Sequence, residues 1–230
     1  MIKWLLEQYV RKTKSSTFSF DEEINTSLLL SFSIDKAFAF LRGLRMVRAN
    51  GKIRRIFFGK SIVLFNKRNI SIGNNVNVGD HVRLSALGRG QLAIGDNVNI
   101  GAFSQVIISM TFSDIGEFIR IGNNVGMGEF AYLGGSGGLE IGSDTIIGQY
   151  FSTHPENHNY SDNTKLIREQ GVTRQGILIG SNCWIGAKVT ILDGVTVGDN
   201  CVIAAGSIVT KSTPDNVVVA GVPAKVIRNR

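Results

Sequence analysis

The sequence has few cysteines and no segment typical of a signal peptide, which argues against a disulfide-stabilised secreted protein. Only two of its 230 residues are cysteine, Cys183 and Cys201. A disulfide framework is therefore not indicated, and a reducing cytosol fits this composition. The chain also lacks an apolar segment with a cleavage site near its start, so we expect no secretory signal peptide.

Long apolar runs and nucleic-acid motifs are lacking too. The most apolar segment, at about residues 22–46, is interrupted by Asp35 and Lys36, which make it too polar for an ordinary transmembrane span. The formal net charge is +7 at pH 7, but no recognition motif or aromatic interleaving accompanies it, so nucleic acid is not an expected partner. We therefore expect a cytoplasmic protein.

The positive charge is concentrated near the start of the chain. Residues 1–68 contain 14 Lys and Arg against 5 Asp and Glu, whereas the remainder contains 11 against 13. We expect residues 1–60 to form a basic extension, with helices at about 1–12 and 22–46. The extension could cap the open end of the following domain, or anchor the chain peripherally on anionic lipid at the inner face of the membrane. The cations that cluster at the end of the second helix and just after it are Arg42, Arg45, Arg48, Lys52, Arg54 and Arg55.

An eight-residue pattern recurs six times after this extension. Its first four positions are an aliphatic residue, Gly, one of Asn, Asp or Ser, and one of Asn or Asp. Two free positions, a second aliphatic residue, and Gly or Ala complete it. The two aliphatic residues lie six apart, a period that fits neither a helix nor a simple strand alternation. The pattern indicates a chain that coils around a prism, with an aliphatic side chain pointing inward on each face. The copies begin at residues 72, 94, 121, 141, 179 and 197.

The spacing of the copies locates the insertions in the repeat. Three hexads make one coil of 18 residues, whereas the copies start 22, 27, 20, 38 and 18 residues apart. Subtracting one coil leaves excursions of about 4, 9, 2, 20 and 0 residues. The longest excursion follows Ile141, and we expect its loop at about residues 157–176. Long loops on a rigid scaffold are where functional residues tend to lie.

Six copies in phase resemble the hexapeptide-repeat acyltransferases over roughly residues 60–230. The resemblance implies an all-β solenoid, a left-handed parallel β-helix, as one domain at residues 61–230. The left hand comes from the resemblance alone, because the general rule for β crossovers favours the right hand. The resemblance also implies a homotrimer with active sites between neighbouring prisms.

The segment from Ile179 to Arg228 resembles the end of coenzyme A-dependent acetyltransferases of this class. This resemblance implies acetyl-CoA as the co-substrate, backbone amides near Ala187 and Ala205 on the pantetheine arm, and Trp184 beside the thioester. Small residues would leave a smooth groove, and hydroxyl and cationic groups would meet the phosphates. Alternatively, Trp184 plugs a corner and the terminal cations are a solvated end. The candidate cofactor-binding residues are Trp184, Gly186, Ala187, Ala205, Gly206, Thr210, Lys211, Lys225 and Arg228.

The longest excursion carries two of the three histidines. A histidine is the usual side chain to take a proton from a hydroxyl near neutral pH. In sugar and antibiotic O-acetyltransferases of this class, the catalytic histidine lies eleven residues after the aliphatic residue of the preceding Ile-Gly pair. Counting from Ile147 gives His158, within a Glu-Asn-His-Asn-Tyr-Ser-Asp stretch that resembles polysaccharide O-acetyltransferases. His154 is the competing candidate. Glu156 could orient a histidine, or it could be a surface carboxylate.

A metal centre is not expected, although a zinc-dependent carbonic anhydrase shares this fold. Catalytic zinc needs three protein ligands that converge to within about 2.1 Å of the ion. His81 belongs to the first coil and His154 to the fourth. Three coil spacings put them roughly 14 Å apart, too far to share one ion.

Together these features predict an acetyl-CoA-dependent O-acetyltransferase that acts on a sugar or glycan in capsule, O-antigen or exopolysaccharide biosynthesis. His158 would take the hydroxyl proton, and the acetyl group would pass directly between bound substrates. No Ser or Cys is visibly paired with a histidine, so no acyl-enzyme is expected. Cys183, on the coil after the excursion, is the residue that could contradict this expectation. The alternatives are an N-acetyltransferase of an amino sugar, an acetyltransferase of a small antibiotic, and a non-enzymatic solenoid.

Overall fold

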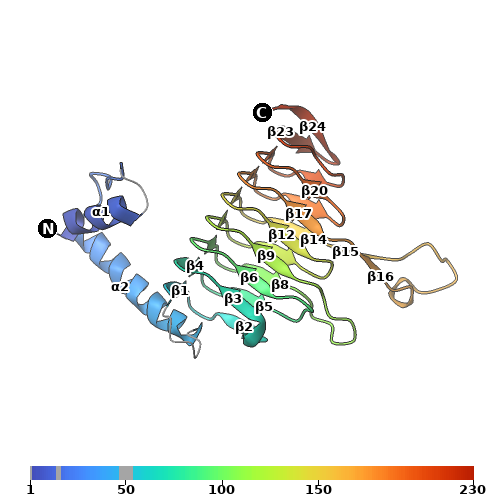
Figure 1. The fold of residues 1–230 in the computed structure, drawn as a ribbon, viewed down its shortest axis with the longest axis horizontal. Coiled ribbons are helices and arrows are strands. Elements are labelled where there is room, and N and C mark those ends of the chain that lie inside the picture. The colour runs from blue at the N-terminus through green and yellow to red at the C-terminus, as the bar shows by residue number, and fades with distance from the viewer. Residues whose placement is uncertain (1, 14–16, 47–53) are drawn as a thin grey trace.

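The computed structural model describes residues 2–13, 17–46 and 54–230. Two helices, α1 (Ile2–Thr13) and α2 (Thr26–Gly43), precede a solenoid whose coils are stacked in chain order (Figure 1). Asn25 caps α2, because its side chain accepts a hydrogen bond from the Leu28 N–H at 2.9 Å. Two helices thus lie where the sequence predicts them. Arg48 and Lys52 of the basic cluster fall outside the described residues.

Three parallel sheets form the three faces of the prism, here called faces A, B and C. Face A contains β1 (Ile56–Phe58), β4 (Val76–Val78), β7 (Asn99–Ile100), β10 (Gly126–Met127), β13 (Ile146–Ile147), β18 (Trp184–Ile185), β21 (Val202–Ile203), β23 (Val217–Gly221) and the antiparallel β24 (Ala224–Asn229). Face B contains β2 (Val63–Phe65), β5 (Arg83–Ser85), β8 (Gln105–Ile107), β11 (Tyr132–Gly134), β14 (Ser152–His154), β19 (Thr190–Leu192) and β22 (Ile208–Val209). Face C contains β3 (Ile70–Ile72), β6 (Leu92–Ile94), β9 (Ile119–Ile121), β12 (Leu139–Ile141), β17 (Ile177–Ile179) and β20 (Thr196–Val197). Strands of successive coils pair in register, an arrangement typical of the left-handed β-helix, and the predicted fold class is confirmed.

The inward positions of the repeat form one continuous apolar core. The first aliphatic residue of every copy is buried, at Ile72, Ile94, Ile121, Ile141, Ile179 and Val197. The fifth position, which the sequence pattern leaves free, is also buried in every copy, at Val76, Val98, Val125, Thr145, Cys183 and Cys201. The two cysteines are therefore core residues one coil apart, and neither forms a disulfide. Full burial of each large aliphatic side chain contributes about 1.5–3 kcal/mol.

The corner between faces C and A is a ladder of Asn and Asp side chains. Asn75, Asn97 and Asn124 adopt the left-handed conformation that Asn tolerates, with φ between 57° and 59°. Each donates its side-chain amide to the Asn or Asp of the next coil at 2.8–3.0 Å. Gly73, two residues earlier, is required for a different reason, since an added Cβ would lie 2.5 Å from the Gly95 carbonyl carbon.

The corner between faces A and B carries an aromatic ladder, defined here as His81, Phe103, Phe130 and Tyr150. These residues also have φ between 57° and 59°, which is rare for bulky side chains and costs about 1–2 kcal/mol each. Their rings are stacked 5.0–5.1 Å apart and within 9° of parallel, and each such pair contributes about 0.5–1.5 kcal/mol. Lys188 continues the ladder, with Nζ 6.0 Å from the Tyr150 ring centroid. Stacking therefore offsets much of the backbone cost.

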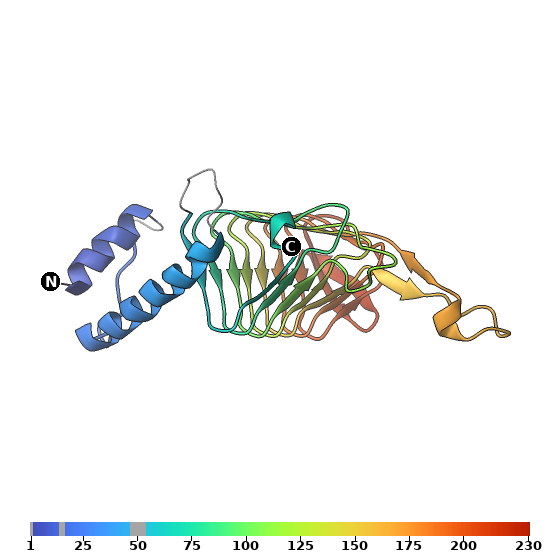
Figure 2. The ribbon, with the colours of Figure 1, turned by 90° about the horizontal axis from the view of Figure 1, so that it is seen from below.

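All the insertions leave the prism at the corner between faces B and C. They are residues 86–91, 108–118, 135–138 and 155–176. The last forms the arm, a hairpin of antiparallel strands β15 (Glu156–His158) and β16 (Val172–Arg174) with a 3-10 helix, η3 (Ile167–Glu169), at its far end. The arm and the helices α1 and α2 extend from opposite sides of the prism (Figures 1 and 2). The other short helices are η1 (Leu44–Met46) and η2 (Lys67–Asn69).

Helix α2 covers the first coil by packing against β1. Gly43 allows the close approach, because an added Cβ would lie 1.9 Å from the Ile56 carbonyl oxygen. The Phe40 and Phe57 rings are 6.0 Å apart, and Arg42 donates from Nε to the Phe58 carbonyl at 2.8 Å. Among the described residues, no helix is both long enough and apolar enough to cross a bilayer.

Candidate active site

The two histidines of the predicted site lie on different parts of the molecule. His154 is the last residue of β14 in face B, where it pairs with Leu192 of the next coil. His158 is the last residue of β15, where it pairs with Val172 on the arm. The sequence assigned both to the excursion, but the chain leaves the coil only after His154. One histidine therefore belongs to the prism wall and the other to the arm.

The wall histidine has an aromatic neighbour. The ring of His154 stacks on Tyr132 of the preceding coil, with centroids 5.6 Å apart. Burial lowers the pKa of His154, and burial together with the charge of Glu156 raises the pKa of Tyr132. At neutral pH, His154 is therefore uncharged and Tyr132 keeps its proton.

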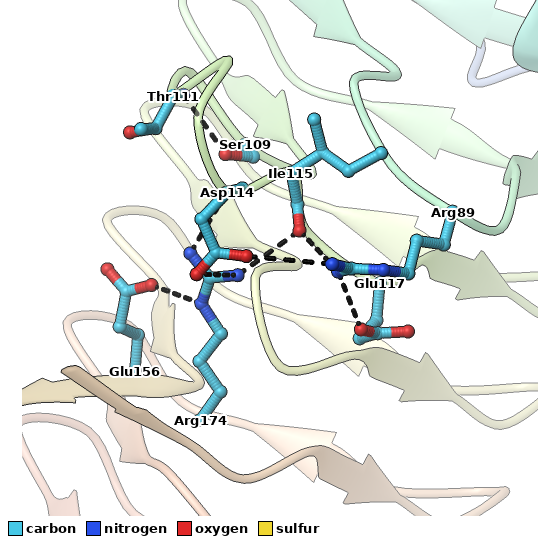
Figure 3. Close-up of polar contacts among 8 residues, drawn as sticks. All are labelled: Arg89, Ser109, Thr111, Asp114, Ile115, Glu117, Glu156 and Arg174. Atoms are coloured by element: carbon cyan, nitrogen blue, oxygen red, sulfur yellow. Dashed lines mark hydrogen bonds and ion pairs between the residues drawn. The ribbon is translucent and has the colours of Figure 1, made fainter. Parts of the chain in front are cut away.

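His158 is exposed on the arm, and the root of the arm is held by an ionic clamp. Arg174 donates from Nε to Oε2 of Glu156 at 2.6 Å, across the two strands of the hairpin. Its other nitrogens reach the 108–118 insertion (Figure 3). Nη1 lies 3.0 Å from the Asp114 carboxylate and donates to the Ile115 carbonyl at 3.1 Å, and Nη2 donates to the Asp114 carbonyl at 3.2 Å. The Arg174 side chain is only 17% exposed, so water screens these contacts weakly.

A second arginine extends the clamp to a third insertion. Arg89, in residues 86–91, donates to the Ile115 carbonyl at 2.7 Å and pairs with Glu117 at 3.1 Å and Asp114 at 3.6 Å (Figure 3). Three insertions from three different coils are thereby joined at one corner. Charge-assisted contacts of this kind are stronger than neutral hydrogen bonds. The clamp therefore fixes the direction in which the arm leaves the prism.

Further contacts hold the arm along its length. Asn157 donates from Nδ2 to the Asp193 carboxylate of the next coil at 2.5 Å. Near the far end, the Gln170 side chain accepts from the Asp162 N–H at 3.0 Å and donates to its carbonyl at 2.8 Å. Glu156 is occupied by Arg174, and a role for this carboxylate in orienting a histidine stays a prediction.

Several candidate cofactor-binding residues lie together at the corner between faces A and B. Gly186 packs directly under Ala205, since an added Cβ at Gly186 would lie 2.4 Å from the Ala205 backbone nitrogen. Gly206 has φ 73° with open space where a Cβ would be. Trp184 lies on face A with 60% of its surface exposed. Small residues thus continue this corner beyond the aromatic ladder. We call Gly186, Ala187, Ala205 and Gly206 the small-residue corner, and the exposed indole of Trp184 flanks it.

The remaining candidates are exposed on the last coil and the terminal hairpin. Thr210 and Lys211 follow β22, and Lys225 and Arg228 belong to β24. Lys225 pairs with Ala220 and Arg228 with Val218 of β23. These side chains form an exposed hydroxyl and cationic group at the C-terminal end of the prism.

The arm and the small-residue corner flank opposite edges of face B. The corner precedes β19 at Lys188, whereas the arm leaves the prism beside Leu192, the partner of His154. Four residues of extended chain, roughly 13 Å, separate these edges. The candidate residues therefore form two groups on one chain, and the histidines do not lie at the small-residue corner.

Burial also affects the reactivity of Cys183, the thiol nearest in sequence to the small-residue corner. Its side chain is 2% exposed and donates to the Gly198 carbonyl at 3.3 Å. Burial raises the pKa of this thiol to about 11, so it is protonated at neutral pH. Cys183 is therefore a poor nucleophile, and the same coil offers no thiolate for an acyl-enzyme.

The sequence reasoning missed the clamp. Arg174, Asp114 and Arg89 lie on three separate insertions, so nothing in their local sequence indicates that they meet. One signal was available: all insertions interrupt the repeat at the same phase, which predicts that they emerge at one corner. The sequence reasoning also missed Tyr132, because its contact with His154 joins successive coils.

Comparisons with known proteins agree with this architecture. Residues 176–211 match the family profile described as "Bacterial transferase hexapeptide (six repeats)". The chain is 39% identical to galactoside O-acetyltransferase of Escherichia coli K12 over 129 residues, which cover 48% of this chain and 64% of that protein. It is 28% identical over 170 residues to WbbJ of the same strain, assigned as an O-acetyl transferase of lipopolysaccharide biosynthesis, covering 71% and 73%.

The chain is thus similar to hexapeptide-repeat transferases over part of its length.

A solved structure supports the fold. It is AntD, an N-acyltransferase from Bacillus cereus, in complex with dTDP and 3-hydroxybutyryl-CoA. The TM-score is 0.51 at 21% identity, over 76% of this chain and 79% of AntD. In three curated relatives, the match spans 37%, 61% and 64% of the relative's own length.

Proposed function

We propose that the chain is an acetyl-CoA-dependent O-acetyltransferase that acts on a sugar hydroxyl. The observation that carries this proposal is the position of His158, which is exposed on an arm that four charged or carbonyl contacts hold at its root. A general base must be exposed to its substrate and yet fixed in direction, and the clamped arm meets both needs. The names of galactoside O-acetyltransferase and WbbJ support hydroxyl acceptors.

The proposed reaction is a direct transfer. The His158 imidazole accepts the proton of the sugar hydroxyl while the hydroxyl oxygen attacks the thioester carbonyl carbon. A backbone N–H near the thioester stabilises the oxyanion. The carbon–sulfur bond then breaks, and the departing thiolate takes the proton from the imidazolium, which leaves an acetyl ester and free thiol. The protonated, buried Cys183 supports a route without an acyl-enzyme.

The acetyl-CoA site in this proposal lies along the small-residue corner. Trp184 lines the thioester end, Gly186, Ala187, Ala205 and Gly206 border the pantetheine arm, and exposed cations meet the phosphates. These cations are Lys211, Lys225 and Arg228, and the Thr210 hydroxyl joins them. Because this corner and His158 flank opposite edges of face B, we propose a homotrimer in which the arm of one chain meets the corner of the next.

The proposed acceptor is a lipid-linked or polymeric surface glycan made at the inner face of the membrane. The test is a transfer assay with purified protein, acetyl-CoA, and a panel of sugars, nucleotide sugars, short glycans, amino sugars and a small antibiotic. We expect acceptor-dependent release of coenzyme A thiol and a product that hydroxylamine cleaves, as it does esters. Transfer only to amino groups, giving hydroxylamine-resistant amides, would overturn the O-acetyl assignment. Thiol release without any acceptor preference would argue against a sugar enzyme.

A further inference from the structure

Helix α2 has two apolar sides, and only one of them is covered by the prism. The side that faces the first coil includes Leu29, Phe40 and Gly43, which are buried or half-buried. Around the opposite side of the helix runs the α2 stripe, defined here as Leu30, Ile34, Phe38 and Leu41. Its members are spaced by four, four and three residues, so they lie on one face of the helix.

The α2 stripe is exposed to an extent that is unusual for large apolar side chains. The exposed fractions are 52% for Leu30, 48% for Ile34, 56% for Phe38 and 57% for Leu41. A contiguous apolar surface of this kind marks a site of contact with another molecule. Helix α2 stands at the end of the prism, away from the arm, so the stripe is accessible without disturbing the candidate active site (Figures 1 and 2).

The charge beside the stripe indicates the partner. Residues 42–68 contain nine Lys and Arg and no Asp or Glu. In the described part of this segment, Arg42, Arg45 and Arg54 have no carboxylate within ion-pair distance, and Arg42 donates to the Phe58 carbonyl instead. Arg45 lies in η1, directly after α2, with its guanidinium 6.0 Å from the Phe58 ring centroid. The chain therefore continues from α2 into a segment whose described cations are exposed, apart from the half-buried Arg42.

We propose that the α2 stripe and the cations of residues 42–46 and 54–68 form a docking surface for an anionic lipid bilayer. The helix would lie in the plane of the interface, with its apolar side chains among the acyl chains and the cations at the head groups. The main rival is a second copy of this chain. Two copies would bring two segments of nine cations together, whereas anionic lipid neutralises them, so charge favours the bilayer.

The surface also sets how the prism meets the membrane. The α2 stripe faces away from the first coil, so the bilayer contacts this end of the prism. The arm and the C-terminal hairpin are then held at a distance from the head groups. This inference rests on the proposed function only for its biological purpose, which is to bring a lipid-linked or nascent glycan near the enzyme. The binding itself needs neither acetyl-CoA nor an acceptor.

The test is co-sedimentation of the full chain with vesicles of phosphatidylcholine alone, or of equal parts phosphatidylcholine and phosphatidylglycerol. We expect binding to the mixed vesicles only, weakening steeply as salt rises, because the Debye length falls to about 8 Å at physiological ionic strength. The Ile34→Ser/Phe38→Ser variant should bind at least tenfold more weakly. The matched control is Leu28→Ser/Phe32→Ser, which removes the same kinds of exposed side chain from the same helix off the stripe.

A second measurement does not depend on removing side chains. Phe38→Cys and, as its control, Leu28→Cys are labelled with an environment-sensitive dye, since the native Cys183 and Cys201 are 2% and 0% exposed. On mixed vesicles, the emission should shift to shorter wavelength at position 38 and less at position 28. Equal shifts at both positions, or equal loss of binding in both serine variants, would overturn the assignment of the stripe.

Self-association and lack of enzymatic activity give distinguishable results. If the full chain ignores mixed vesicles at low salt, while Ile34→Ser/Phe38→Ser lowers its mass in solution by light scattering, the stripe binds another copy and the proposal fails. The serine variant should transfer acetyl groups to a soluble acceptor at the wild-type rate. A chain that binds vesicles but transfers nothing would refute the proposed function and leave the docking surface intact.

Discussion

Arg174 and Glu156 face each other across the two strands of the arm, with Nε 2.6 Å from Oε2. They are cross-strand partners in the hairpin, and Arg174 also reaches Asp114 on the 108–118 insertion. The same guanidinium therefore closes the hairpin and ties it to a neighbouring coil. His158 lies two residues beyond Glu156 on β15, so its position depends on this contact.

We expect Arg174→Gln to lower kcat for acetyl transfer by about 10-fold or more, since a small displacement of a catalytic group is costly. Stability should fall by only about 1–2 kcal/mol, because the Glu156 and Asp114 carboxylates are 32% and 53% exposed and the prism core is untouched. Affinity for coenzyme A should stay unchanged, because Arg174 is not among the residues proposed to bind it. Steady-state kinetics and calorimetry measure these quantities.

The matched control for this change is Arg89→Gln. Arg89 binds the same insertion but does not touch the arm. It should reproduce the loss of stability and leave kcat close to the wild-type value. If both variants lose activity in proportion to their stability, the clamp is structural and does not position His158.

The second prediction concerns the base. His158→Ala should lower kcat by about 10² or more, the low end of general-base contributions, with coenzyme A affinity near wild type. His154→Ala is the comparison, because it removes the wall histidine that stacks on Tyr132. If His154→Ala abolishes transfer and His158→Ala keeps most of it, the spacing argument from Ile147 is wrong.

The sequence predicted the architecture well because the repeat is local. The first aliphatic residue of each copy points inward, as expected, and the Asn and Asp that follow at the corner between faces C and A take positive φ. The excursions also occur where the arithmetic puts them. Each of these features depends on a few adjacent residues within one six-residue repeat, so the repeat is sufficient to predict it.

What the sequence could not predict are contacts between coils. Phe103 and Phe130 lie 27 residues apart, yet their rings stack. Arg174 and Asp114 are 60 residues apart and meet only because their insertions share a corner. The buried fifth position of each copy was missed because Thr145, Cys183 and Val76 have little in common chemically apart from modest size. His154 was placed in the excursion since the pattern gives no sign of where the coil ends.

The third prediction concerns the proposed phosphate contacts. Replacing Lys211 and Arg228 together by Gln should weaken coenzyme A binding, because two exposed cations near the phosphates are lost. Pantetheine without phosphates should be affected much less. Calorimetry with both ligands measures the difference, and equal losses would put the phosphates elsewhere. Lys60→Gln, an exposed cation on the first coil, is the control for a general effect of charge.

The fourth prediction is a pH dependence of stability from Cys183. Burial raises the pKa of its thiol to about 11 from an ordinary value near 9.0. Because the folded state favours the protonated thiol, this contribution is fully present below about pH 9 and is lost as the pH rises toward 11. Urea unfolding between pH 7 and pH 11 should show the decline, and Cys183→Ala should make it shallower. An identical decline in both proteins would assign it to other groups.

The last prediction tests whether stacking compensates for the strained corner between faces A and B. Phe130 lies in the middle of the aromatic ladder, with φ 58° and a ring about 5 Å from those of both Phe103 and Tyr150. Phe130→Ala removes both stacked pairs and keeps the left-handed backbone of a residue with a Cβ. It should destabilise the chain by about 1–3 kcal/mol.

Phe130→Gly removes the same two stacked pairs but also removes the cost of positive φ. It should therefore be less destabilised than Phe130→Ala by about 1 kcal/mol, although glycine adds entropy to the unfolded chain. Chemical denaturation of the three proteins measures both differences. If Phe130→Gly is at least as stable as the native chain, stacking contributes less than the backbone conformation costs. The ladder would then require another explanation, such as burial of its exposed ring edges against a neighbouring chain in the proposed trimer.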